Sequence, residues 1–445
     1  MSLGLVEFDL ARDLFPLTAG ILAALGCGLL GNFLVLRRLS LMGDAISHSV
    51  LPGLVIAFLV TSSRGSLAMF IGAALAGLAT VVLVEAVKRL GRVESGAAMG
   101  VVFSVLFALG VLLIEVASAR GVDLDADCVL HGQLETLVWF SAPDSWSDLR
   151  AGELWSAVPQ EVITLSVMVL VVLAFTGLFF KELRIAAFDP ALSTTLGFHS
   201  GLMHYALMVL VAFATVASFE AVGSILVIAM LICPASTARL LTDRLRTQVL
   251  LSGVIAVVTA VGGYLAANAV PAIWGKEEVN AAGSITVFSG VLLALAVVFS
   301  PRHGVLIRRV RQSRLARVVV REDLLATLYR ASESGEASTP VESLVRRRPL
   351  HGVHAALRRS ERRGEVEVAD GKARLTEQGR HVAASLIRRH RLWEHYLVDE
   401  AGLPPDHVHE TAEILEHLRT EPPEGPGIDP HGKQIPRGER DPEGG

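Results

Sequence analysis

The chain has 445 residues, 52% of them hydrophobic, and a mean hydropathy of +0.51, which is too apolar for an ordinary soluble protein of this size. Its formal net charge of −4 excludes little, because the charged residues are sorted by location along the chain. Its three cysteines are scattered without paired spacing, which excludes a disulfide framework and a zinc knuckle.

Apolar runs long enough to cross a bilayer, roughly 20 residues each, recur up to Ser300 and do not occur after it. About nine spans are expected, and each must be helical because backbone groups find no water in lipid. They lie near residues 15–36, 47–62, 67–87, 97–118, 161–180, 202–220, 222–241, 249–270 and 282–300. The sequence therefore predicts an all-α polytopic membrane domain over residues 1–300. No cleaved signal peptide is expected, because the N-terminus is acidic.

Lysine and arginine concentrate in alternate loops of this domain, which sets its orientation. The basic loops contain Arg37–Arg38, Lys88–Arg92, Lys181–Arg184 and Arg239–Arg246. Cytoplasmic loops carry such an excess, so the N-terminus is predicted to lie outside. The basic run 308–317 then places the C-terminal part in the cytoplasm. We expect a multi-pass protein of the plasma (inner) membrane, with membrane lipid around it.

Asp44 and His48 stand beside the second apolar run and share one face of a helix, because they are four residues apart. Ionisable groups at membrane depth are costly and usually functional. A carboxylate next to an imidazole is a plausible ligand pair for manganese, iron or zinc. The alternative is an interfacial helix cap whose histidine bonds a backbone carbonyl. Spacing alone leaves both readings open.

Two segments, Gly43–Gly53 and Val222–Ala238, resemble signature motifs of the manganese/zinc/iron class of ABC-transporter permeases. The resemblance covers residues 15–300. It implies a homo- or heterodimer of permeases, a pair of cytoplasmic ABC ATPase subunits and an extracytoplasmic metal-binding protein. It also implies that Asp44 and His48 coordinate the metal in the pathway. The stretch Phe188–Gly197 resembles the short coupling helix that docks on the ATPase.

The chain contains no phosphate-binding loop of the type Gly-x-x-x-x-Gly-Lys-Ser/Thr. It also shows no nucleophile–base set that would indicate an enzyme. We therefore expect a transport subunit that has no catalytic residues of its own. ATP hydrolysis is expected on a separate chain.

A basic linker, 301–320, is expected to lead into a winged helix-turn-helix over residues 321–376. The pattern is a helix near Arg321–Tyr329, a capping box at Thr339–Glu342 with Pro340 as first helical residue, a helix near Leu350–Arg363 and a hairpin turning at Asp370–Gly371. Its arginine clusters could meet DNA phosphates, meet lipid headgroups or solvate a face.

Residues 377–436 are predicted to form metal-binding and dimerisation-like helices, near Glu377–Asp399 and Pro405–Arg419. Glu413, Glu416 and His417 have the spacing of one helical face. Two carboxylates and an imidazole suit manganese or iron(II) better than a thiolate-preferring metal. An exposed charged face is the alternative, and spacing does not separate the two. The tail 437–445 is expected to be disordered.

This C-terminal part resembles the iron/manganese-dependent repressors related to the diphtheria toxin repressor, over residues 322–436. The matching segments are Leu375–Arg380, Arg389–Glu394, Val408–His417 and Asp429–Pro436. The resemblance implies two sets of ligands. The first consists of Asp323, Glu413, Glu416 and His417, and the ancillary one of His390, Glu394 and His409.

Asp323 and Glu413 match the manganese-type repressors, although Ala326 takes the place of one acidic ligand of that type. Gly352 and His354 stand where the family has Thr- and Ser-like base-contacting residues, so DNA is a doubtful partner. We expect a permease subunit of an ABC importer for divalent metal ions, Mn2+ first and then Fe2+ or Zn2+, with a fused metal-sensing domain. A membrane-tethered metal-dependent transcriptional regulator is the alternative.

Overall fold

A computed structural model describes residues 9–61, 66–118, 134–139, 157–273, 279–347, 352–415, 417 and 427–436. The chain divides into two compact units, Met1–Ile307 and Arg308–Gly445. The division at residue 300 and the basic linker stay predictions, but the residues of that linker are helical from Val305 onward. The predicted disordered tail lies outside the described residues.

The first unit is all-α, as predicted. Among the described residues, eight helices are long and apolar enough to cross a membrane. They are α1 (Leu10–Leu36), α2 (Met42–Thr61), α3 (Ser66–Gly91), α4 (Ser95–Ser118), α7 (Gln160–Leu178), α10 (Ser200–Leu241), α11 (Leu245–Ile273) and α12 (Ala281–Phe299). Three short elements lie between them: η1 (Leu134–Thr136), α8 (Phe180–Phe188) and α9 (Pro190–Thr195).

The sixth and seventh predicted spans form the single element α10, which has 42 residues. Its helical geometry is interrupted at Gly223, where φ is 78° and ψ is 167°. A side chain would be strained in this conformation, which is why glycine occupies the break. The described residues therefore contain eight candidate membrane helices where about nine spans were predicted, because two predicted spans join in α10.

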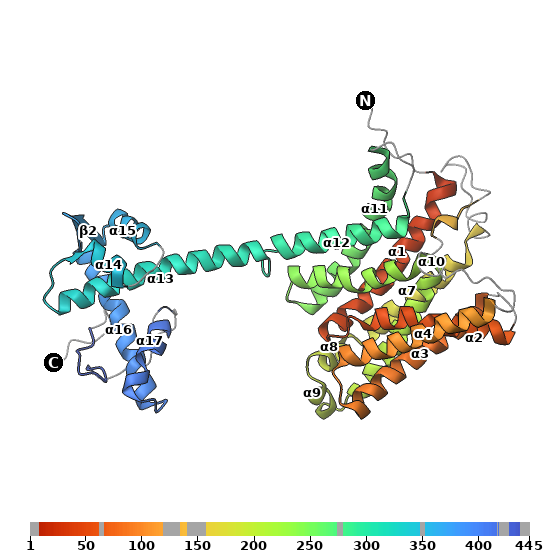
Figure 1. The fold of residues 1–445 in the computed structure, drawn as a ribbon, viewed down its shortest axis with the longest axis horizontal. Coiled ribbons are helices and arrows are strands. Elements are labelled where there is room, and N and C mark those ends of the chain that lie inside the picture. The colour runs from red at the N-terminus through yellow and green to blue at the C-terminus, as the bar shows by residue number, and fades with distance from the viewer. Residues whose placement is uncertain are drawn as a thin grey trace. The chain divides into compact units, whose positions relative to one another are not determined.

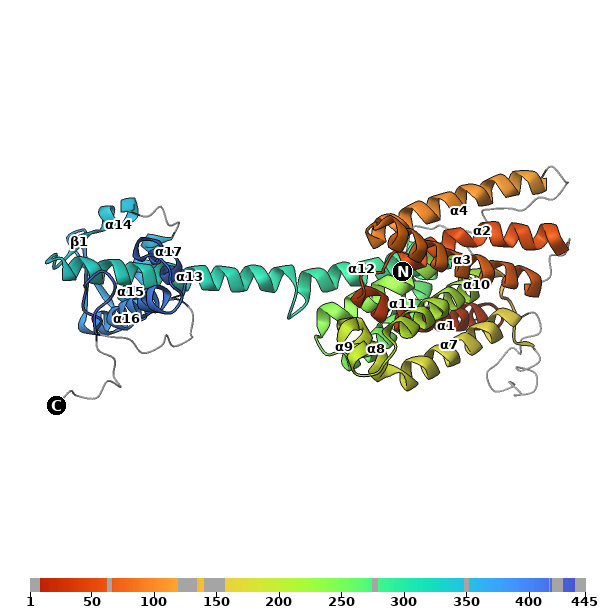
Figure 2. The ribbon, with the colours of Figure 1, turned by 90° about the horizontal axis from the view of Figure 1, so that it is seen from below.

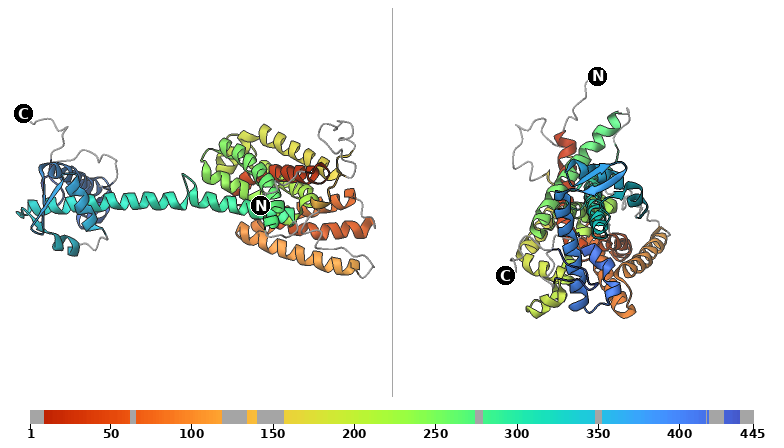
Figure 3. Two further views of the ribbon diagram at one scale, coloured as in Figure 1. Left: turned by 90° about the horizontal axis from the view of Figure 1, so that it is seen from above. Right: turned by 90° about the vertical axis from the view of Figure 1, so that its left-hand side faces the viewer.

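Helix α10 is the centre of the first unit and contacts α1, α2, α3, α7, α11 and α12. Helices α2, α3 and α4 group on one side of α1, whereas α7 lies on the other (Figures 1 and 2). The same grouping is visible in Figure 3, where the orange helices lie apart from the yellow-green α7. Large side chains that include Phe33, Met208 and Met230 fill the buried core. Helix α4 exposes many apolar side chains, as a lipid-facing helix would.

The second unit combines helices with a small antiparallel sheet. Its elements are α13 (Val305–Glu333), β1 (Thr339–Pro340), α14 (Val341–Arg347), α15 (Val353–Arg362), β2 (Val366–Ala369), β3 (Lys372–Leu375), α16 (Glu377–Asp399), η3 (Pro405–His407) and α17 (His409–Leu415). The strand order is β1-β3-β2, with Val366 opposite Leu375. Asp370 and Gly371 both have positive φ, 52° and 70°, as a two-residue hairpin turn requires.

Two predicted boundaries in this unit are wrong, and α16 matches its predicted range. Pro340 is not the first residue of a helix: it lies in β1 opposite Lys372, and α14 begins at Val341. A proline without an N–H is tolerated in such an edge strand. The last helix begins at His409, because residues from Pro405 to His407 form a separate 3-10 turn. The observed element order agrees with the predicted one, and its assignment as a winged helix-turn-helix stays a prediction.

Candidate metal sites

Asp44 and His48 lie in the first turns of α2, deeper in the helix than the predicted span suggested. His48 Nε2 is 3.3 Å from Asp44 Oδ1, and both side chains are half-buried. The helix that carries them is locally unusual, because Pro52 has no N–H to donate to the carbonyl of His48. The structure therefore brings the predicted pair together on one face of a membrane helix.

Helix α4 forms an aromatic wall beside this pair. The His48 ring lies 5.4 Å from the Phe103 ring and 5.5 Å from the Phe107 ring, measured between centroids. Such packing restricts the rotation of the imidazole and lowers the local dielectric, which strengthens the interaction of a carboxylate with a cation. The pair is therefore held in a partly dehydrated setting with one apolar side.

His390, Glu394 and His409 meet between α16 and α17, as the ancillary set predicted. Glu394 Oε1 lies 3.1 Å from His390 Nε2 and 2.9 Å from His409 Nδ1, and the two nitrogens are 3.0 Å apart. Burial alone would raise the pKa of Glu394, but hydrogen bonding and charge interaction with the two adjacent histidines outweigh this effect and lower the pKa to about 2. Glu394 is therefore an ionised carboxylate at physiological pH.

The three donor atoms of this cluster have the chemistry and spacing that fit a divalent cation. If both imidazole nitrogens carried protons, two N–H groups would converge on one oxygen at a nitrogen separation of 3.0 Å. A cation bound by the lone pairs of the two nitrogens and of Glu394 Oε1 would remove that conflict. Bonds of about 2.1 Å at right angles separate neighbouring ligand atoms by about 3 Å, close to the observed distances. The set of imidazole and carboxylate suits manganese, iron or zinc.

A further histidine, His431, comes near this cluster and was not predicted as a ligand. Its Nε2 lies 3.9 Å from Glu394 Oε1. Arg391 holds the segment in place, since it pairs with Asp429 at 3.4 Å, with Glu333 at 2.7 Å and with the carbonyl of Gln434. The sequence contained the segment Asp429–Pro436 as a motif, but only the fold shows which cluster it approaches.

The other predicted set is only partly described. His417 Nε2 lies 3.2 Å from Asp323 Oδ1. Glu413 lies in α17, which ends at Leu415, two residues before His417. Glu416 lies outside the described residues. Glu322, which the sequence did not indicate, reaches the opposite nitrogen of the same ring: its Oε2 is 2.7 Å from His417 Nδ1. His417 is therefore held between two neighbouring carboxylates of α13.

Comparison with known proteins identifies both units. The profile of the ABC 3 transport family matches residues 14–139 and 149–300. The profile described as iron dependent repressor, metal binding and dimerisation domain matches residues 376–422. The second match contains the whole His390, Glu394 and His409 cluster as well as His417.

Two curated relatives illustrate the similarity. The manganese transport system membrane protein MntD of Bacillus subtilis is 41% identical over 295 residues, which are 66% of this chain and 94% of MntD. The zinc transport system membrane protein TroD of Treponema pallidum is 36% identical over 375 residues, which are 82% of this chain and 96% of TroD. The alignment with TroD is longer than the first unit, so it reaches into the second.

A solved structure agrees with the fold of the membrane unit. PsaBC from Streptococcus pneumoniae, in complex with a Fab, has 29% identity and a TM-score of 0.51, and the match covers 65% of this chain and 92% of the PsaBC chain. The family profile covers more than half of the chain, and both relatives are matched over nearly their full length. The chain therefore belongs to the ABC 3 transport family, and its C-terminal unit contains an iron-dependent-repressor metal-binding and dimerisation domain.

Proposed function

We propose that this chain is the permease subunit of an ABC importer for divalent metal ions, and that its C-terminal unit senses the same ion. Manganese is the first candidate cargo, followed by iron and zinc. The names of MntD and TroD, a manganese and a zinc transport protein, support this choice of ions. The oxygen and imidazole donors of the candidate sites support manganese in particular.

The observation that carries the proposal is the Asp44–His48 pair inside a membrane helix. The cation would exchange part of its hydration shell for the Asp44 carboxylate and the His48 imidazole. Two protein ligands leave most coordination positions to water or to other groups, so binding is weak enough for release. A pathway site must satisfy both demands, since an ion that is held too tightly is not conducted.

The proposed assembly contains a second permease chain, a pair of ABC ATPase subunits and an extracytoplasmic metal-binding protein. Helix α9, capped by Asp189 through hydrogen bonds from Ala191 N and Leu192 N, is the candidate coupling helix. The alternation of basic loops supports an outside N-terminus and a cytoplasmic second unit. Operator binding by a membrane-tethered regulator is a separate hypothesis, and Gly352 at the start of α15 offers no side chain for it.

Reconstitution tests the proposal directly. Vesicles that contain the full transporter with its ATPase and binding protein are loaded with ATP on the ATPase side, and uptake of radioactive manganese is measured. ATP-dependent uptake is expected, with competition by iron(II) and zinc but not by magnesium or calcium, because these two prefer an all-oxygen shell. A folded, ATP-hydrolysing complex that moves none of the three transition metals would refute the transport assignment.

Glu322 is expected to orient His417 for metal binding by accepting the proton of Nδ1, so that Nε2 faces the ion beside Asp323. Carboxylates that hold a ligating histidine in this way typically contribute 10- to 100-fold to affinity. Glu322→Ala should therefore weaken manganese binding at the His417 site by about that factor, whereas Glu322→Gln, which keeps an oxygen acceptor, should weaken it less.

Calorimetric titration with Mn2+ checks this prediction, and nitrogen NMR of labelled histidine reports the tautomer of His417. The control is Glu336→Ala, an exposed acidic residue beyond the end of α13. Equal affinity and an unchanged tautomer in Glu322→Ala would contradict the orienting role.

A further inference from the structure

A pocket of about 410 Å³ opens among the ends of α1, α3, α4, α8, α9 and α10, and its described lining includes neither Asp44 nor His48. Its size falls in the range of small-ligand sites. The described residues that line it include four permanent cations, Arg37, Arg38, Lys88 and Arg89, and a single carboxylate, Glu85. The pocket is therefore strongly electropositive.

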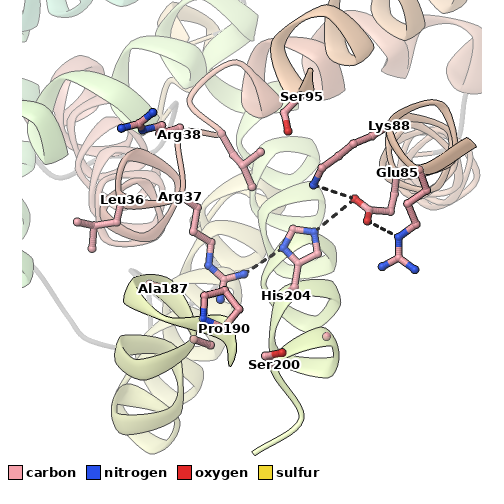
Figure 4. A pocket seen from close by; sticks show the side chains of 14 residues that line it. Leu36, Arg37, Arg38, Glu85, Lys88, Ser95, Ala187, Pro190, Ser200 and His204 are labelled. Atoms are coloured by element: carbon pink, nitrogen blue, oxygen red, sulfur yellow. Dashed lines mark hydrogen bonds and ion pairs between the residues drawn. The ribbon is translucent and has the colours of Figure 1, made fainter. Parts of the chain in front are cut away.

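The carboxylate of Glu85 already has partners on its own helix, α3, and on α10. It lies 2.6 Å from Arg89, 3.7 Å from Lys88 and 3.8 Å from His204 Nε2. Figure 4 shows Glu85 and Lys88 approaching His204 from one side, while Arg37 approaches it from the other. No carboxylate remains in the described lining for the two arginines at the end of α1.

Arg37 has hydrogen-bonding capacity that its surroundings do not use. Its Nη1 donates to His204 Nδ1 at 3.0 Å, but its Nε and Nη2 are buried and have no hydrogen-bond partner among the described residues. A buried donor without an acceptor is unfavourable, and more so when it is charged. The planar fork of arginine matches the oxygens of a phosphate group. These two nitrogens are shielded here, so binding requires the side chain to rotate toward the pocket.

Helix ends of both polarities meet at this pocket. Helix α4 begins at Ser95 and α10 begins at Ser200, and both residues line the pocket. The first turn of a helix presents unpaired N–H groups and the positive end of its dipole. The last turns of α1, α3 and α8 place opposing negative dipole ends at the same pocket, so its positive potential comes from the side-chain cations.

We propose that this pocket binds the phosphate group of an anionic phospholipid. Leu36 and Leu39 give it an apolar side next to the cations, which suits the glycerol and first methylenes of a lipid better than free phosphate. The pocket lies at the ends of membrane helices on the side where the basic loops gather, and basic pockets between such helices bind lipid headgroups. The inference does not depend on which metal the transporter carries.

The test is the thermal unfolding midpoint of the purified full-length chain in detergent, titrated with phosphatidylglycerol, phosphatidylcholine or inorganic phosphate. Phosphatidylglycerol should raise the midpoint saturably, and phosphatidylcholine should not. Each removed cation should weaken binding about fivefold, so Arg37→Gln with Lys88→Gln should raise the half-saturating concentration about 25-fold. The control Arg311→Gln removes a cation of α13 outside the pocket and should change it less than twofold.

A more conservative variant and two further results of the titration also test the lipid site. Arg37→Lys keeps the positive charge but loses the planar guanidinium group, and it replaces the double variant in the test if that variant does not fold. The Arg37→Lys protein should bind phosphatidylglycerol several-fold more weakly than wild type. Equal stabilisation by inorganic phosphate at matched concentration would show that the pocket takes soluble phosphate and would overturn the lipid assignment. Equal stabilisation by both lipids, or wild-type half-saturation in Arg37→Lys and the double variant, would overturn the site.

Discussion

Asp44→Ala should reduce ATP-dependent manganese uptake by at least 100-fold while leaving the transporter assembled. The substitution removes the carboxylate of the pair and leaves the His48 imidazole, 5.4 Å from the Phe103 ring centre, as its single ligand. A borderline dication that sheds water at this point needs the carboxylate, since loss of even an outer-shell group at a metal site typically costs 10- to 100-fold. Asp44→Asn should behave almost like Asp44→Ala, because it keeps the shape but not the charge.

Uptake into vesicles, normalised to the amount of reconstituted complex, measures this effect. Glu115→Ala is the matched control, because Glu115 is an exposed carboxylate on the membrane helix α4 and no predicted ligand lies beside it. Its uptake should remain within twofold of wild type. ATPase activity that remains in Asp44→Ala would show intact assembly, and wild-type uptake in that variant would refute the pathway assignment.

Glu394→Ala should lower the manganese affinity of the His390, Glu394 and His409 cluster by at least 100-fold. Glu394 Oε1 is the atom that His390 and His409 share, and the side chain is only 3% exposed. Its removal leaves two imidazoles with no negative charge to balance the ion, in a buried setting where that charge matters most. Because regulation requires the metal to distinguish two conformations of the transporter, the variant should still transport but should lose its response to high manganese.

Titration is best performed in an Asp44→Ala background, so that the pathway pair does not contribute. His395→Ala is the control on the same helix: His395 pairs with Asp399 at 3.1 Å and lies one residue beyond Glu394. It should bind manganese as the background protein does. Unchanged affinity in Glu394→Ala would show that the ion binds elsewhere. A response to manganese that persists after the affinity is lost would separate regulation from this cluster.

The sequence predicted features that depend on local spacing. The membrane spans follow from apolar run length, α16 was predicted at its observed bounds, and the Asp44–His48 contact follows from a separation of one helical turn. The capping box at Thr339 failed because pairing between β1 and β3 overrides a local helix signal. Hydropathy also could not show that two spans join into α10, because it is insensitive to the backbone angle at Gly223.

Contacts between distant segments were accessible only through the fold or through family resemblance. Glu322 meets His417 across 95 positions, so no spacing rule indicates the pair. His431 approaches Glu394 only because Arg391 fixes its segment. The basic pocket is lined by residues from six helices. In the sequence, its arginines were indistinguishable from the ordinary excess of positive charge in cytoplasmic loops.

The interruption of α10 at Gly223 restricts how this helix can take part in a transport cycle. A backbone that leaves helical geometry inside a bilayer has amide groups that lipid cannot satisfy, and Val222, Gly223 and Ser224 are accordingly enclosed by protein. Because Gly223 already departs from helical geometry, a change in the angle between the two halves of α10 would require the fewest broken helical hydrogen bonds at this residue. Because Gly223 has to stay within the bundle throughout, any transport motion of α10 should move its two ends and leave its middle enclosed by protein.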